Sequence, residues 1–194
     1  AILIINPNNP TGTLYPPEIL LEIVKIAREH NLIIFSDAIY DRLVMDGKVH
    51  TSTAALAGDD VVCVTLNGLS KSHCLCGFRC GWLVLSGNKS AYADIMQGLV
   101  KYASMRLCGN ALTQLVIPAA LADDEYTKSM IIPGGRLYEQ REATARGLSG
   151  IDGITYVKNS AAFYMFPRLD KARFGIKDDK KFAMDLLHEK HILI

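Results

Sequence analysis

The chain of 194 residues has almost no excess of charge of either sign, since 21 Lys and Arg stand against 20 Asp and Glu. A net charge of +1 gives no reason to expect nucleic acid or an anionic membrane as a partner. No apolar run approaches the roughly 18 residues that a membrane-spanning helix requires. No internal repeat or low-complexity tract is present. Because 49% of the residues are hydrophobic and 21% are charged, the composition is that of a globular protein and excludes a disordered or collagen-like chain.

The N-terminal residues lack the features of a signal peptide. The first ten residues, AILIINPNNP, contain neither the basic segment nor the small-residue cleavage site of a signal peptide. We therefore predict a cytoplasmic location. The chain starts in an apolar run and stops in another, HILI, and both runs are typical of strands. This pattern predicts a piece of a longer protein, with an incomplete domain.

The cysteines are odd in number, which argues against a disulfide framework and favours free thiols in a reducing compartment. Three of them lie in one run with a histidine, HCLCGFRC at residues 73–80. A structural zinc site usually takes two ligand pairs from separate turns, and the sequence offers no second pair. We therefore predict no metal and expect packed thiols. The five cysteines are Cys63, Cys74, Cys76, Cys80 and Cys108.

The first half of the chain alternates between strand-like and helix-like patterns. Continuous apolar runs at 2–5, 32–35, 61–66 and 82–85 are typical of strands that are buried on both faces. Two prolines, Pro16 and Pro17, open a segment with a helical period that extends to residue 28, which predicts that Ile19, Ile23, Ile26 and Ala27 form the covered face. Strands that alternate with helices indicate an α/β fold with a mostly parallel sheet.

The pattern changes after about residue 88. Helices are predicted at 88–104, at 110–122 and, with many charges and little core face, at 136–146. Short strands near 155–157 and 162–166 and a helix at 178–190 complete the chain. We therefore expect a sheet unit at 1–105, connecting helices at 106–148 and part of a smaller α+β unit at 149–194.

Polar side chains stand at or near the ends of these predicted strands. Ligands of α/β sheets bind outside the carboxyl ends of the strands, and Asp, Lys and Arg are seldom buried without a partner. Each residue alone has an ordinary structural interpretation, as a turn former, a helix cap or a solvated cation. Together they match the needs of a single cofactor. The residues are Asn9, Asp37, Tyr40, Lys71 and Arg79.

That cofactor is pyridoxal phosphate, because the sequence resembles the fold-type I, class I and II aminotransferases. The resemblance lies in the runs NPNNPTG, SDAIYDRL, NGLSKSHCLCGFRCGW, ASMRLC, PGGRLYEQR and FYMFP. It is greatest to bacterial alanine (glutamate–pyruvate) aminotransferases. It implies a three-layer α/β architecture, in which 1–105 is part of a large pyridoxal-phosphate domain and 149–194 is part of a small C-terminal domain. It also implies amino-acid and 2-oxo-acid substrates and a homodimer.

The resemblance assigns catalytic roles to three residues. Lys71 resembles the lysine that forms the Schiff base and moves the substrate proton, which requires a free amine. Asp37 resembles the carboxylate that keeps the pyridine nitrogen protonated, so that the ring accepts electrons. Tyr40, together with Asn9, would donate to the ring oxygen. A cis peptide bond between Asn9 and Pro10 is also implied.

The phosphate of the cofactor is assigned to Ser70 and Arg79, since a guanidinium fork suits a dianion. Two positions depart from the family pattern. Gly68 stands where many relatives carry a hydroxyl residue, and Ala161 stands where glycine is frequent. Relatives are about twice as long, and they carry the glycine-rich phosphate cup and the arginine for the substrate carboxylate outside the region that this chain covers.

Two other functions compete with an aminotransferase. A C–S lyase of the same fold shares the Asp, Tyr, Lys and Arg motifs, and a truncated, catalytically incompetent fragment would share them as well. A serine acyl enzyme is suggested by Ser86 and Lys89 in a Ser-x-x-Lys pattern, but the accompanying Ser-Asp-Asn and Lys-Thr-Gly motifs are absent. We therefore discard that third interpretation.

Overall fold

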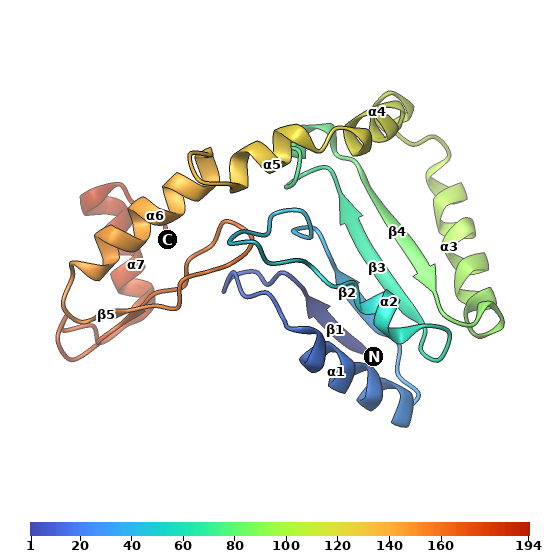
Figure 1. Ribbon diagram of the computed structural model, residues 1–194, viewed down its shortest axis with the longest axis horizontal. Coiled ribbons are helices and arrows are strands. Elements are labelled where there is room, and N and C mark those ends of the chain that lie inside the picture. Colours follow the sequence, from blue (N-terminus) through green and yellow to red (C-terminus); the bar gives the residue numbers. More distant parts are fainter.

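The computed structural model describes all 194 residues and is built around a four-stranded sheet with the order β1-β2-β3-β4 (Figure 1). The neighbouring pairs β1–β2 and β2–β3 are parallel, whereas β4 runs antiparallel to β3. The predicted α/β fold with a mostly parallel sheet is therefore confirmed. The strands are β1 (Ile2–Ile5), β2 (Ile34–Asp37), β3 (Cys63–Gly68) and β4 (Gly81–Ser86).

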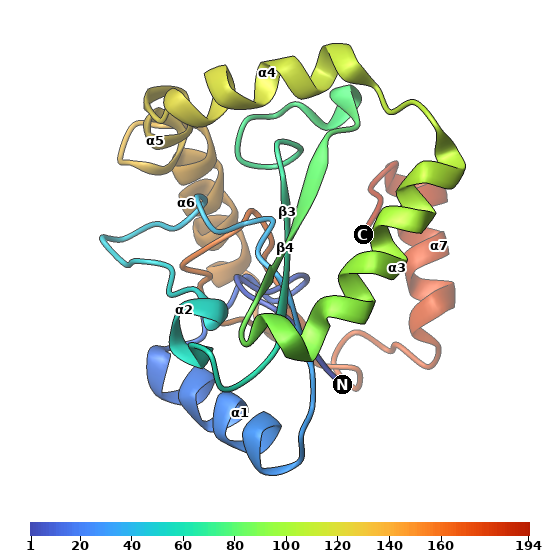
Figure 2. The same cartoon turned by 90° about the vertical axis from the view of Figure 1, so that its right-hand side faces the viewer.

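One face of the sheet is covered by α1 (Pro17–Glu29) and α2 (Thr53–Ala57), and Figure 2 shows both helices on the same side of the strands. The helix α1 begins at a proline, whose fixed φ suits the first helical position. Between helices and sheet lies the main core. Its buried members are Ile4, Leu20, Val24, Ala27, Ile34, Ala57, Val61 and Cys63.

The predicted covered face of α1 is right for Ala27, which is fully buried, and for Ile23, which packs against the core, but it is wrong for Ile19 and Ile26. The prediction that β1 is buried on both faces is also wrong. Ile19 and Ile26 are 49% and 46% exposed, because α1 turns its neighbouring apolar stripe, Leu20 and Val24, toward the sheet. Leu3 on β1 is 68% exposed, so β1 is covered on one face only. The second face of the sheet therefore remains apolar and open within this chain.

The second half of the chain is mainly helical. In Figure 1, α4, α5 and α6 follow one another from the sheet toward the C-terminal part, where α7 lies near α6. The 14 residues of α3 include no buried side chain. No helix has both the length and the hydropathy needed to cross a membrane. The elements are η1 (Cys76–Phe78), η2 (Lys89–Tyr92), α3 (Ala93–Arg106), α4 (Ala111–Ala122), α5 (Glu125–Ile131), α6 (Arg136–Ser149), β5 (Ile154–Thr155), β6 (Arg168–Leu169) and α7 (Asp179–Lys190).

The strand predicted at 162–166 is wrong. The chain makes only an isolated antiparallel bridge there, between Val44 and Ala161, and then turns at Ala162, whose φ is +55°. The strand predicted at 155–157 is shorter than expected and pairs at 154–155 with β6. The turn matters for function, because it directs the next two aromatic residues toward the ends of β2 and β3.

Candidate functional site

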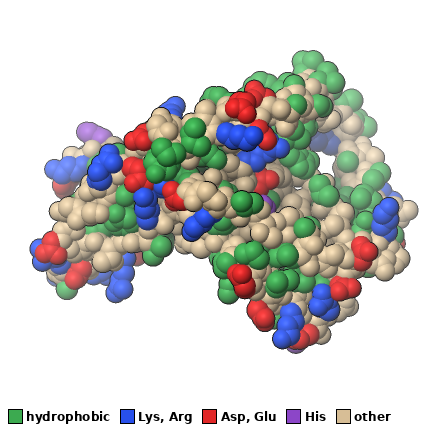
Figure 3. All heavy atoms as spheres, in the orientation of Figure 1, with side chains coloured by type: hydrophobic (Ala, Val, Ile, Leu, Met, Phe, Trp, Pro, Cys, Tyr) green, Lys and Arg blue, Asp and Glu red, His purple; other side chains and the backbone are tan.

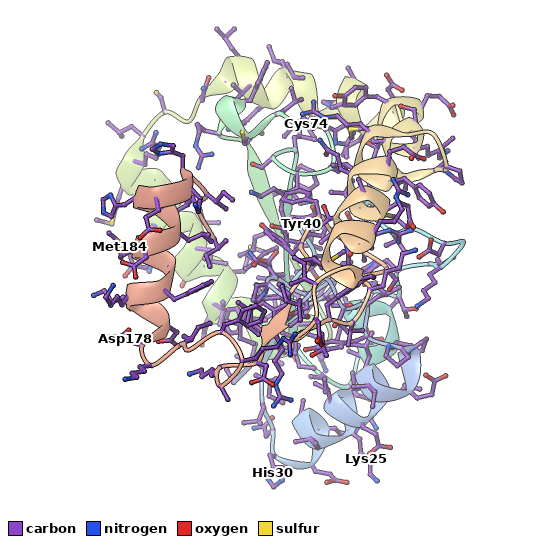
Figure 4. The ribbon with its side chains drawn as sticks, turned by 90° about the vertical axis from the view of Figure 1, so that its left-hand side faces the viewer. Lys25, His30, Tyr40, Cys74, Asp178 and Met184 are labelled. Carbon is purple, nitrogen blue, oxygen red and sulfur yellow. The ribbon has the colours of Figure 1, made fainter.

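A cavity of about 440 Å³ opens at the carboxyl ends of the parallel strands. The structure brings all six residues that were singled out from the sequence to its wall. Figure 4 shows Tyr40 between the sheet and the ribbon of α6, near the middle of the molecule. The cavity is lined by Ile5, Asn9, Asp37, Ile39, Tyr40, Leu66, Asn67, Ser70, Lys71, Cys76, Arg79 and Tyr164.

Asp37 is placed by the end of β2, where it pairs in register with Ile5 of β1 and Leu66 of β3. Its Oδ1 accepts a hydrogen bond from the backbone N–H of Ile39 at 3.0 Å. That contact fixes the carboxylate, and its Oδ2 accepts no hydrogen bond from this chain. The half-buried Asp37 therefore has one oxygen available for a donor from a ligand.

The loop NPNNPTG between β1 and α1 carries Asn9. Both Asn6–Pro7 and Asn9–Pro10 are cis peptide bonds, so the isomer implied for the second is confirmed and the first was not anticipated. Gly12 has a φ of +68°, and a Cβ there would lie 2.4 Å from the Cβ of Asn159 and 2.7 Å from the carbonyl oxygen of Tyr164. Only glycine fits at this contact, which brings the loop against the segment around residue 160.

Two cations without a carboxylate partner line the cavity. Neither Lys71 nor Arg79 forms an ion pair within the chain, although nine such pairs form elsewhere. The Nζ of Lys71 lies 5.9 Å from the ring centroid of Phe163. Arg79 donates from Nη1 to the carbonyl oxygen of Cys76 at 2.7 Å. Two unpaired cations beside the hydroxyl of Ser70 make this side of the cavity suitable for an anion.

Gly68, one of the two departures from the family pattern, has a structural reason. It faces Gly81 across the β3–β4 pair, and a Cβ at residue 68 would lie 2.8 Å from the carbonyl oxygen of Cys80. A hydroxyl side chain therefore does not fit at this position, and Ser70 is the hydroxyl residue on the cavity wall. The other departure, Ala161, is fully buried where the chain bridges to Val44.

Tyr40 is buried and lies in an aromatic cluster that the sequence did not predict. Its ring meets those of Phe163 and Tyr164 edge-on, with centroid distances of 5.4 and 5.6 Å. Burial raises the pKa of the Tyr40 phenol well above its usual value, and the contact with Tyr164 raises it further, as does the nearby Asp37 carboxylate, whereas the Asn9 side chain lowers it. Tyr40 therefore stays protonated and can act as a donor near neutral pH.

An ion pair on α6 fixes the segment that carries Phe163 and Tyr164. Arg141 on α6 is buried, with a side chain 3% exposed, and its guanidinium makes two 2.7 Å hydrogen bonds to the Asp46 carboxylate. It also donates to the carbonyl oxygen of Asn159 at 3.0 Å. The prediction that this helix has little core face missed the buried Arg141 and Ala145. Arg141 therefore joins α6, the chain beyond Tyr40 and the residues just before the aromatic pair.

The thiols differ from the expectation that they would be packed. Cys63 and Cys80 are buried, but Cys74, Cys76 and Cys108 are exposed, and Figure 4 labels Cys74 at the upper part of the chain. Burial raises the pKa of the Cys63 thiol. No group of three or more His, Cys, Asp and Glu side chains lies close enough together to hold a metal ion.

Comparisons with known proteins agree with this arrangement. The family model described as aminotransferase class I and II matches residues 1–194. The chain is 50% identical over 194 residues to a glutamate-pyruvate aminotransferase AlaA of Haemophilus influenzae, covering 100% of this chain and 48% of the relative. A crystal structure of an aminotransferase from Escherichia coli superimposes with a TM-score of 0.95 at 48% identity, covering 100% of this chain and 48% of the other.

An alanine aminotransferase from Pyrococcus furiosus is more distant, with a TM-score of 0.86 and 34% identity over 99% of this chain and 47% of the other. The chain therefore spans about half the length of the relatives that it matches.

Proposed function

The chain belongs to the class I and II aminotransferases, and on that premise we propose that it forms the cofactor-holding part of a pyridoxal-phosphate-dependent aminotransferase. The reaction would move an amino group between an amino acid and a 2-oxo acid. Alanine and glutamate are the proposed amino donors, because the relative from Haemophilus influenzae carries the name glutamate-pyruvate aminotransferase. One observation carries the proposal: a carboxylate, an amine, a guanidinium, a phenol and an amide line a single cavity.

The chemistry of this donor set fits pyridoxal phosphate. Asp37 offers a free carboxylate oxygen to a protonated ring nitrogen, while Tyr40 and Asn9 offer a phenol and an amide to the ring oxygen. Arg79 and Ser70 can donate to the phosphate, since no carboxylate in this chain competes for that guanidinium. Lys71 would hold the cofactor through Nζ.

When bound, pyridoxal phosphate supplies an acceptor for the electron pair that remains when a Cα–H bond of the substrate breaks. The residues of this chain move and hold protons around that event. Lys71 Nζ, when it is a free amine, would act as the base that takes and holds the proton of the substrate carbon. The Asp37 carboxylate, which the Ile39 N–H holds in place, would keep the ring nitrogen of the cofactor protonated and charged. Tyr40, kept protonated by its buried position, donates without losing its hydrogen.

The domain boundaries, the homodimer and the cytoplasmic location stay proposals. Residues 1–105 would belong to a large cofactor domain, 106–148 would connect, and 149–194 would belong to a small domain. The homodimer is supported by apolar side chains that this chain leaves exposed over α3 and α4, the region where hydrophobic atoms gather at the upper right of Figure 3. They include Val100, Met105, Leu107, Leu112 and Leu115.

The test uses the protein expressed from its full open reading frame and loaded with pyridoxal phosphate. Borohydride reduction followed by mass mapping should place the label on Lys71, and Lys71→Ala should abolish both the label and amino transfer from alanine to 2-oxoglutarate. Lys101→Ala is the matched control, because that lysine lies on exposed α3, outside the cavity. A label on Lys89 or Lys101 would refute the assignment. Release of pyruvate and a thiol from cystathionine, without amino transfer, would instead support the C–S lyase.

A further inference from the structure

The phenol of Tyr164 contacts the phenol of Tyr40, although 124 residues separate them in the sequence. Their Oη atoms lie 2.6 Å apart, a short hydrogen bond in which either atom can donate. Both side chains line the cavity that holds Asp37 and Lys71. Tyr164 was not among the residues predicted for the site, and the strand expected at 162–166 gave it no role.

The backbone holds Tyr164 in this place from two directions. The chain beyond Tyr40 pairs with the chain before Tyr164 through two 2.8 Å hydrogen bonds, from Met45 N–H to the Ser160 carbonyl and from Ala162 N–H to the Leu43 carbonyl. On the other side, the glycine of the NPNNPTG loop packs against the Tyr164 carbonyl. The contact between the two phenols is thus part of a fixed local arrangement.

The direction of this hydrogen bond determines whether Tyr40 keeps its hydroxyl hydrogen for a ligand. A phenol carries one hydrogen and can accept in addition. If Tyr40 gave its hydrogen to Tyr164, it would have none for a ligand in the cavity. If Tyr164 donates instead, Tyr40 keeps its hydrogen and becomes a stronger donor, because accepting one hydrogen bond polarises the O–H that makes the next.

We propose that Tyr164 donates to Tyr40 Oη and thereby leaves the Tyr40 hydrogen for the ring oxygen of the cofactor. The inference rests on the proposed function, and it makes Tyr164 a positioning residue that acts only through Tyr40.

The consequence is measurable as a shift in the pH midpoint of the colour change of the Lys71-bound cofactor. A strong donor to the ring oxygen stabilises its anionic form, so the nitrogen that joins Lys71 to the cofactor loses its proton more easily. Removing the Tyr164 donor should therefore raise the midpoint. The rise should be about half a pH unit for Tyr164→Phe, and larger for Tyr40→Phe, which removes the direct donor.

The experiment records visible absorbance against pH for the loaded protein from the full open reading frame, as wild type and as Tyr164→Phe. Tyr156→Phe is the matched control, because that phenol donates to the Ala145 carbonyl at 2.8 Å and lies outside the cavity. It should leave the midpoint unchanged. In a Tyr40→Phe background, Tyr164→Phe should add no further shift. Tyr164→His keeps a donor and should stay near the wild-type midpoint.

An unchanged midpoint in Tyr164→Phe, or a shift that persists in the Tyr40→Phe background, would overturn the proposal that Tyr164 acts by donating to Tyr40. If Tyr164→Phe does not fold, the comparison of Tyr164→His with Tyr164→Leu supplies the same contrast between a donor and no donor. Failure of the proposed function looks different, because the wild type itself would then show no cofactor band and no label on Lys71.

Discussion

Replacing Arg141 by methionine should destabilise the protein by about 2–3 kcal/mol. Removing one partner of a buried ion pair costs about 3–5 kcal/mol. A value below that range, about 2–3 kcal/mol, applies here because Asp46 is 38% exposed and can regain water. Methionine keeps most of the aliphatic volume of Arg141, so the loss reports the hydrogen bonds to Asp46, Asn159 and Glu142 rather than a cavity.

The assay is the urea midpoint of unfolding, measured for Arg141→Met beside Lys181→Met. Lys181 pairs with Asp185 at 2.5 Å on the surface, with side chains 71% and 48% exposed, so its removal should shift the urea midpoint far less than the removal of Arg141. Equal losses in the two variants would refute the argument from burial.

The same pair predicts a dependence on pH. The hydrogen bonds from Arg141 hold the pKa of the Asp46 carboxyl below its usual value. A lowered carboxyl pKa contributes stability that is complete above the ordinary carboxyl range and is lost as the pH falls through the lowered value. The deficit of Arg141→Met should therefore be largest near neutral pH and should shrink below about pH 4. A deficit that stays constant down to pH 3 would contradict the assignment of the stabilisation to the ion pairs of Arg141 with Asp46 and Glu142.

Three further predictions follow from single contacts. Asp37→Asn keeps an oxygen for its backbone donor but loses the charge, so amino transfer by the full-length enzyme should fall on the order of 100-fold or more, and a near-normal rate would leave Asp37 with only a capping role. Gly12→Ala forces a Cβ to 2.4 Å from that of Asn159 at a φ of +68°, and thermal unfolding should reveal a decrease of about 1–3 kcal/mol in the free energy of unfolding. Burial raises the pKa of the Cys63 thiol, so a thiol reagent should label exposed Cys74 at once and Cys63 only after urea is added; simultaneous labelling would show that the core is open.

The strands and the residues at their ends were the most predictable part of the molecule. Each parallel strand is an apolar run that stops at a polar residue, and parallel strands bring such ends to one edge. Asp37 and Lys71 therefore reach one cavity wherever the helices between them lie.

The face that α1 buries was not predictable from its own sequence. The helix has two apolar stripes, one with Ile19 and Ile26 and the other with Leu20 and Val24, and a helical period alone supports both. The sheet decides between them, since Leu20 and Val24 pack against Ile4 and Ile34 in the core. Ile19 and Ile26 remain exposed because the sheet covers only one side of the helix.

Tyr164 was missed because its position depends on contacts between distant segments. The apolar run at 162–166 has the composition of a strand, but the positive φ of Ala162 ends the pairing after one bridge. No local pattern records that a glycine at residue 12 allows this segment to approach the NPNNPTG loop, or that Arg141 anchors its start. The wall of the cavity therefore combines strand ends that are encoded locally with one phenol that is placed by the tertiary fold. Because the Tyr164 phenol is hydrogen-bonded to the Tyr40 phenol, these tertiary contacts also fix the position of Tyr40, which lies just beyond the end of β2.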